Sequence, residues 1–130
     1  GLSLTPEDIA RANLTRARIH INLCRFFETY DLLVTPTVMA APRQVEIRYL
    51  DEVAGVKFDN YVDWLMHTYV LTPSGCPAVS MPCGFTNDGL PVGLQLVAPP
   101  RAEAALLSAA AAFEANQSLQ WRTPIDPRVK

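Results

Sequence analysis

The segment from Gly75 to Pro99 constrains the fold of this chain more than any other. It holds two short apolar stretches, 78–82 and 91–97, separated by the sequence Thr86-Asn-Asp-Gly89. Glycine adopts the positive φ that tight turns require, so this spacing predicts two strands joined by a turn. Both faces of the second strand are largely apolar, with Val92, Leu94 and Leu96 on one and Gly93, Gln95 and Val97 on the other. We therefore expect both faces of these strands to be covered by other structure.

Helices are predicted on either side of this segment. Alanine-rich residues from Arg101 to about Asn116 predict a helix that covers the strands, because alanine favours helix and allows close approach. Its expected buried side consists of Leu106, Leu107, Ala110 and Phe113. Near the start of the chain, Thr5 can cap a helix and Pro6 suits the first helical position. This helix should run to about Tyr30, with an apolar stripe formed by Ile9, Ile19, Leu23, Phe26, Phe27 and Tyr30.

The middle of the chain predicts a strand, a loop and a second helix. Residues 32–35 indicate a short strand buried like the internal strands of α/β sheets and ended by Pro36. Residues 37–58 are typical of a long loop with at most one short helical turn. Asp59 or Asn60 can then cap a helix that reaches about Leu71.

This second helix is apolar nearly all round, and only Asn60, Asp63 and His67 form a polar stripe. Such a helix is normally buried on several sides. The composition also indicates that part of the surface contacts other protein, since charged residues make up 18% of the 130-residue chain, against roughly 25% in typical domains. We therefore expect the chain to be a homo-oligomer, most simply a twofold dimer. The alternative is a compact monomer with a weakly charged surface.

Charge and hydropathy exclude several partners. A net charge of −2 argues against a surface that follows nucleic-acid phosphates, and the cluster Arg11, Arg16, Arg18 and Arg25 is interpreted as the solvated face of the first helix. No apolar run approaches the roughly 20 residues that span a bilayer, and no signal peptide opens the chain. We expect a cytoplasmic protein without nucleic-acid or membrane partners. Gly1 in place of Met indicates a processed, tagged or truncated start.

The three cysteines, Cys24, Cys76 and Cys83, form neither a disulfide framework nor a zinc motif. An extended segment would separate Cys76 from Cys83 by about 23 Å, which excludes a bridge. Reduced and mostly buried thiols are expected, with no metal and no cofactor.

Several motifs together resemble the amidase signature family. They are Gly75-Cys-Pro-Ala-Val-Ser-Met-Pro-Cys-Gly84, Gly89-Leu-Pro-Val-Gly-Leu-Gln-Leu-Val-Ala-Pro99, the helix 103–114 and the strand Tyr30-Asp-Leu-Leu-Val-Thr-Pro-Thr37. The resemblance implies an α/β fold, a C-terminal fragment of the family's mixed β-sheet flanked by helices. The whole chain, 1–130, is then a single segment with a helix in 1–30, a strand and loop in 31–58, helix, two strands and helix in 59–116, and an irregular tail in 117–130.

The same resemblance implies hydrolysis of carboxylic amide C–N bonds by a serine, a cis-serine and a lysine. In the family, the lysine and a loop rich in glycine and serine precede this region, and nothing in this chain matches either. No catalytic residue is therefore assigned. A small-molecule amide is the expected substrate of a full-length enzyme that includes this chain.

Other candidate residues have simpler interpretations. Asp63 and His67 have the spacing of an oriented imidazole, and Ser80 could be their nucleophile. We favour a solvent-facing pair and a hydrogen-bonded strand residue, because Ser80 lies mid-strand without the sharp turn that presents a nucleophile. Neither lysine, Lys57 in a loop or Lys130 at the terminus, has the desolvated setting of a base. Gln95 is interpreted as a core amide bonded to backbone.

Substrate contact is predicted for Val62, Leu65 and Tyr69, which share one face of the second helix. In related amidases the corresponding face lines the pocket. Leu65 falls where the aminoacyl-tRNA amidotransferase branch carries an acid, so the pocket here should be apolar. Plain core packing is the alternative. Thr72 stands where many relatives have asparagine, so the adjoining loop is expected to differ.

Three functional hypotheses follow. The first is the C-terminal segment of an amidase, which contributes strands and one wall of the acyl pocket and is not catalytic alone. The second is a stand-alone, non-catalytic binding or oligomerising module derived from an amidase. The third is part of the A subunit of a tRNA-dependent amidotransferase, which the apolar Leu65 disfavours because an ammonium-bearing substrate wants a negative partner.

Overall fold

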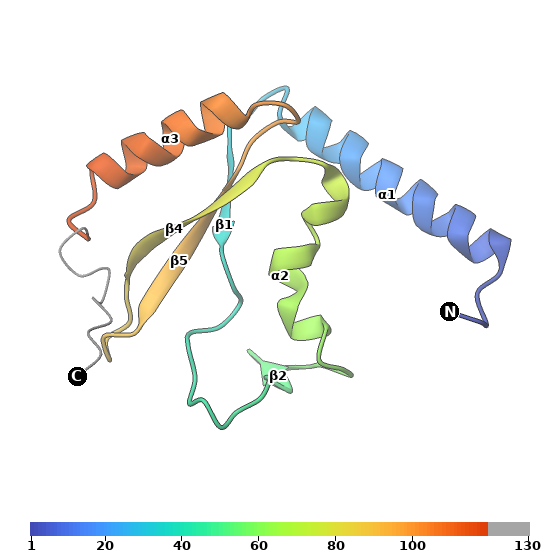
Figure 1. The fold of residues 1–130 in the computed structure, drawn as a ribbon, viewed down its shortest axis with the longest axis horizontal. Helices are drawn as coiled ribbons and strands as arrows, with labels where there is room; N and C mark the ends of the chain where they lie inside the picture. Colours follow the sequence, from blue (N-terminus) through green and yellow to red (C-terminus); the bar gives the residue numbers. More distant parts are fainter. Residues whose placement is uncertain (120–130) are drawn as a thin grey trace, which may run out of the picture.

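The computed structural model describes residues 1–119 and has a three-stranded antiparallel sheet at its centre (Figure 1). The strand order is β1 (Leu33–Pro36), β5 (Pro91–Val97) and β4 (Ala78–Phe85). Helix α3 (Glu103–Ala115) contacts β4 and β5, and α1 (Pro6–Phe26) extends away from the sheet. The predicted α/β class is confirmed. The expected tail beyond residue 119, including Trp121 and Pro124, lies outside the described residues.

Strands β4 and β5 form the predicted pair joined by a tight turn. Ala78 lies opposite Val97, and Phe85 lies opposite Pro91, with an irregularity in the register between Pro82 and Gly84. The turn closes through a hydrogen bond from Thr86 N–H to the Leu90 carbonyl at 2.8 Å. Gly89 has a φ of 80°, a conformation that glycine adopts without steric cost. Sequence alone therefore placed this turn correctly.

The core lies between α3 and one face of the sheet. Leu106 and Ala110 of α3 are 3% and 5% exposed and pack against the buried Leu96 and Ala98. The prediction that Leu107 shares this side is wrong, since its side chain is 62% exposed. Successive residues of an α-helix are about 100° apart around the axis, so only one of two adjacent leucines can face a flat sheet.

Strand β1 pairs with β5 on one side only, so it is an edge of the sheet. Val34 is 52% exposed, and the expectation of a strand buried like an internal one is wrong for the described chain. The expectation that both faces of the strands β4 and β5 are covered is wrong for β4, in which Ala78, Ser80 and Pro82 on one face are exposed. The described residues supply one covering helix, α3, and too little other structure to enclose the strands.

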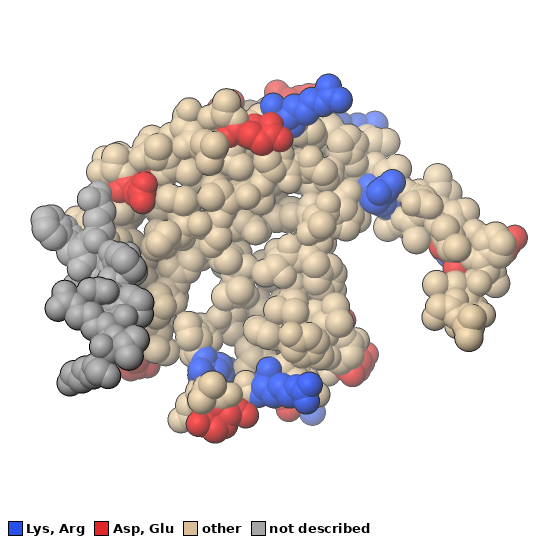
Figure 2. All heavy atoms as spheres, in the orientation of Figure 1, with Lys and Arg blue, Asp and Glu red and all other residues tan. Residues whose placement is uncertain are grey.

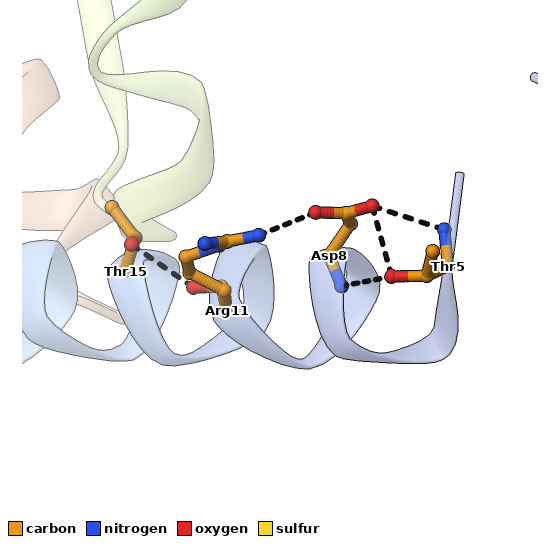
Figure 3. Close-up of polar contacts among 4 residues, drawn as sticks. All are labelled: Thr5, Asp8, Arg11 and Thr15. Carbon is orange, nitrogen blue, oxygen red and sulfur yellow. Dashed lines mark hydrogen bonds and ion pairs between the residues drawn. The ribbon is translucent and has the colours of Figure 1, made fainter. Parts of the chain in front are cut away.

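Helix α1 begins at the predicted cap, which Figure 3 shows in detail. The Thr5 hydroxyl accepts a hydrogen bond from the Asp8 N–H, and the Asp8 carboxylate accepts one from the Thr5 N–H at 3.0 Å. This reciprocal pair satisfies N–H groups that have no partner within the helix. Asp8 also forms an ion pair with Arg11. The helix ends at Phe26, four residues earlier than expected, and none of its residues is buried.

This cap predicts a pH dependence of α1. The Thr5 N–H, the Thr5 hydroxyl and the Arg11 guanidinium all hold the pKa of the exposed Asp8 carboxyl below its usual value. Because the pKa is lower in the folded state, the carboxylate stabilises the helix fully above the unfolded pKa of about 3.9. This stabilisation disappears as pH falls through the folded pKa. We expect circular dichroism to show helix loss on acidification that is smaller in Asp8→Asn, which already has less helix at neutral pH. Glu7→Gln is the control, and an acid transition in Asp8→Asn as large as in the unmodified chain would contradict this role.

Residues 59–75 form short turns of helix and not the continuous helix predicted. The turns are η1 (Asp63–Leu65), α2 (Met66–Tyr69) and η2 (Thr72–Ser74), and the segment ends at Gly75 with a φ of 73°. The predicted cap at Asp59 or Asn60 is wrong, because Val62 is the N-cap residue of η1 and no side chain makes a capping bond there. Asn60 instead forms a turn just before η1, where its side chain accepts the Val62 N–H at 2.8 Å. The expected burial on several sides is also wrong, since Val62 is 52% and Met66 is 47% exposed. Aromatic and β-branched residues favour helix weakly, and packing that could compensate is missing.

The loop from residue 37 to 58 contains no helix in the described structure, only a small hairpin of β2 (Glu52–Val53) and β3 (Val56–Lys57). Its two turn residues, Ala54 and Gly55, both have positive φ, the geometry that matches the twist of a two-residue hairpin. In Figure 1 this loop and α2 lie together on one side of the sheet. Within residues 1–119, no helix is both long and apolar enough to cross a membrane.

Candidate functional site

The predicted substrate-binding residues lie on the short helical segment between the loop and η2. Val62 precedes η1, Leu65 ends it, and Tyr69 ends α2. Leu65 is half-buried, whereas Val62 and Tyr69 are 52% and 40% exposed. Val62 and Tyr69 are therefore not part of the core of the described residues. Both side chains are accessible to a substrate or to further protein.

The same helical segment turns other side chains toward two cavities beside the loop. Trp64 lines a cavity of about 300 Å³ with residues of the loop 38–50. His67 lines one of about 340 Å³ with the loop 36–42 and the start of β5, Pro91 to Gly93. Val62, Leu65 and Tyr69 line neither cavity. Figure 2 shows open space between the sheet and the part of the chain that holds α2 and the loop, and charged side chains gather below this space at the lower edge of the molecule.

Both cavity-lining side chains have a polar atom without a partner. Trp64 Nε1 and His67 Nδ1 are buried and make no hydrogen bond within residues 1–119. A buried N–H without a partner is costly, so such atoms mark places where a water, a ligand or further protein can bind. Trp64 is not among the residues predicted for the site, because hydrophobic periodicity describes a helix face and says nothing about a neighbouring irregular loop.

Asp63 and His67 do not form the pair that their spacing allowed. Asp63 accepts a hydrogen bond from the Asn60 amide at 2.9 Å, and no hydrogen bond joins it to His67 in the described structure. Both side chains are half-buried, which corrects the expectation that they face solvent. The Asp63 carboxylate thus binds the Asn60 amide, three residues earlier in the chain, in place of the His67 ring.

A row of hydroxyl and amide groups crosses the sheet. Ser80, Gln95 and Thr35 lie side by side in register on β4, β5 and β1, so they share one face. The Gln95 Nε2 donates to Thr35 Oγ1 at 3.2 Å, and Ser80 Oγ lies 2.8 Å from Thr37 Oγ1. The prediction that Ser80 is a hydrogen-bonded strand residue is confirmed. Gln95 is paired as expected, but with a threonine hydroxyl instead of backbone.

The loop after β1 approaches this row closely at Gly93. A Cβ on Gly93 would lie 2.7 Å from Thr37 Oγ1, so only glycine fits at this point. The Thr37 N–H also donates to the Gly93 carbonyl at 3.1 Å. These contacts hold the Thr37 hydroxyl, just after the end of β1, against the Ser80 hydroxyl in β4.

Chemistry by these hydroxyls would require a base, and the described residues do not provide one. Ser80 bonds to Thr37 and to no imidazole, amine or carboxylate within residues 1–119. Lys57 is exposed in β3, and Lys130 lies outside the described residues. No group of three or more histidine, cysteine or acidic side chains in residues 1–119 could hold a metal ion.

Comparison with known proteins decides the family. The profile of the Amidase family matches residues 5–107, which is most of the chain. The chain belongs to the amidase family. The match runs from the capped helix α1 through the sheet and into α3.

Curated relatives of this amidase segment are several times longer. An acylamidase of Rhodococcus erythropolis is 38% identical over 97% of the segment, which covers 26% of that protein. The A subunit of the glutamyl-tRNA(Gln) amidotransferase of Moorella thermoacetica is 49% identical over 75% of the segment and 19% of the subunit. The segment therefore spans about a quarter or less of the length of these relatives.

Solved structures agree with this assignment. The segment superposes on 6-aminohexanoate cyclic dimer hydrolase with a TM-score of 0.75 at 29% identity, covering 93% of the segment and 26% of the hydrolase. A bacterial aryl acylamidase of the amidase signature family gives a TM-score of 0.80 at 24% identity over 95% of the segment and 27% of that enzyme, which shows the shared fold. The fold class predicted from the sequence is thus that of amidase-signature enzymes.

Proposed function

We propose that this chain is the C-terminal part of an amidase that hydrolyses carboxylic amide C–N bonds, and that it is not catalytic on its own. The observation that supports this most strongly is the similarity to an acylamidase over nearly the whole chain but only 26% of that relative. A nucleophilic serine needs a base within hydrogen-bond reach. The described residues place none at Ser80, so the rest of a longer enzyme must supply the reacting groups.

In this enzyme the chain would contribute sheet strands and part of the pocket for the acyl group. Val62, Leu65 and Tyr69 would contact the substrate from one side, as proposed from their shared face. The partly apolar surroundings suit a neutral small-molecule amide. The exposed side chains on this face and the unpaired Trp64 Nε1 nearby support a ligand-facing role. Three free cysteines are consistent with a reducing, cytoplasmic compartment.

The alternative is a stand-alone, non-catalytic module that oligomerises. Its support is the exposed apolar surface of α1, where Ile9, Leu14 and Ile21 are 55%, 69% and 47% exposed. A monomer rarely exposes large contiguous apolar patches, so a second copy could cover this helix.

The third hypothesis is that the chain is part of an amidotransferase A subunit, and the similarity to such a subunit supports it. Leu65 argues against it, because the position is apolar.

One experiment separates the first two hypotheses. The chain of 130 residues and the product of the whole reading frame would be assayed with a simple aryl amide, and both would be examined by sedimentation. We expect turnover by a longer product only, with no activity in the short chain above background. If the native product has the mass of the short chain, sediments as a dimer and turns over no amide, the oligomerising module is correct. Turnover by the short chain that Ser80→Ala abolishes would contradict both.

A further inference from the structure

A thiol and an imidazole lie one helical turn apart on α1. Cys24 Sγ is 3.6 Å from Nε2 of His20, within hydrogen-bonding distance for sulfur. The other ring nitrogen, Nδ1, is 2.6 Å from the carbonyl oxygen of Ser74, which is 54 residues later in the sequence. A carbonyl only accepts hydrogen bonds, so Nδ1 carries the proton in this contact. In the neutral ring, Nε2 is then the acceptor that faces the thiol.

The Ser74 carbonyl is well placed to hold the ring. Ser74 is 1% exposed and belongs to the turn η2, the part of the chain that α1 contacts. Its hydroxyl donates to the Leu71 carbonyl at 2.5 Å and accepts the Cys76 N–H at 3.1 Å. These bonds fix the turn, and the turn fixes the tautomer and direction of the imidazole. The pair therefore depends on tertiary contact and not on helical spacing alone.

The other two cysteines lack such a partner. Cys83 donates from its thiol to the Val92 carbonyl at 3.6 Å, and a carbonyl oxygen does not take up a proton at neutral pH. Cys76 uses its backbone N–H in the bond to Ser74, and no described bond involves its thiol. All three cysteines are half-buried, so accessibility alone does not separate them. Among the three thiols, Cys24 alone faces a nitrogen base within residues 1–119.

We propose that Cys24 is a site of covalent modification by low-molecular-weight disulfides, with His20 as the base for its thiol. Nε2 takes the thiol proton while Sγ attacks one sulfur of the disulfide, and the sulfur–sulfur bond breaks. The departing thiolate then takes up the proton, so the products are a mixed disulfide at Cys24 and one free small thiol. The disulfide is the oxidant, and no other co-reactant is needed. Neither residue lines the cavities beside Trp64 and His67, so this proposal is independent of the amidase function.

The test treats the native, full-length protein with oxidised glutathione and follows each cysteine peptide by mass spectrometry over time. We expect the mixed disulfide to form first at Cys24. Loss of a general base typically costs 10²-fold or more, so His20→Gln should slow reaction at Cys24 by at least about tenfold. His67→Gln is the matched control, since it changes the other histidine and should leave the rate at Cys24 unchanged.

A comparison without mutation guards against misfolding of the variant. The ratio of the Cys24 rate to the Cys83 rate is measured in the native protein and again in urea, where the imidazole is no longer held. We expect the ratio to be larger in the native protein. Equal ratios in the two states, or an unchanged Cys24 rate in a folded His20→Gln protein, would overturn the proposal.

Discussion

Replacing Leu65 by Asp in the full-length amidase is expected to change its substrate preference. If the face formed by Val62, Leu65 and Tyr69 contacts the acyl group, the new carboxylate stands in an apolar wall. Pocket contacts of this size are worth roughly 1–3 kcal/mol, so kcat/KM for apolar amides should fall several-fold to a few hundred-fold. Amides that carry an ammonium group should lose less, because they can pair with the new charge.

The measurement is kcat/KM for one apolar and one amino-bearing amide in the unmodified enzyme and in Leu65→Asp. Val70→Asp is the matched control, since Val70 is 42% exposed, lies in the same segment and is not one of the three predicted substrate-binding residues. It adds the same charge nearby and should leave the ratio between the two substrates as it is. A ratio that is also unchanged in Leu65→Asp would show that this face packs against protein and does not contact substrate.

Two adjacent leucines in α3 are expected to differ sharply in their contribution to stability. Leu106 is 3% exposed in the core against the sheet, whereas Leu107 is 62% exposed. Leu106→Ala removes buried methyl groups and leaves a cavity, which typically costs about 2–5 kcal/mol of unfolding free energy. Leu107→Ala removes an exposed side chain from a helix that alanine favours, so its effect should stay within about 0.5 kcal/mol.

Urea denaturation followed by circular dichroism measures both variants, which carry the same chemical change at neighbouring helix positions. The midpoint should fall strongly for Leu106→Ala and hardly move for Leu107→Ala. Equal losses would show that Leu107 is also covered, for example by a second copy of the chain or by the remainder of the enzyme. Comparing the two variants therefore also tests whether protein outside the described residues covers Leu107.

The sequence correctly predicted those elements that depend on interactions between residues close together in the chain. Thr5 and Pro6 start α1 because capping involves residues only three apart in sequence. Gly89 closes the turn between β4 and β5 because its conformational freedom belongs to the residue itself. The pairing of Gln95 followed from the cost of a buried amide, although its partner, Thr35, lies 60 residues away and was not foreseen.

The parts of the site that were missed depend on irregular backbone. Trp64 became a candidate only when the loop 38–50 was seen beside it, since that loop has no periodicity from which its path could be inferred. His67 was a candidate from its spacing to Asp63, but its place beside the loop 36–42 was not foreseen. The failed prediction of a continuous second helix has a related cause. An apolar segment indicates burial, but whether it forms one helix or several turns depends on the partners that pack against it.

The sequence by itself determined the family, the two strands with their turn, the capped first helix and the alanine-rich helix. Each of these depends on neighbouring residues or on motifs that the amidase family shares. Only the tertiary structure decided that Leu106 and not Leu107 faces the core, that His20 meets the Ser74 carbonyl, and that Thr37 reaches Ser80. The physical reason is that these contacts join residues far apart along the chain, or depend on which side of a helix meets a sheet. Distances of this kind are set by packing and not by local sequence.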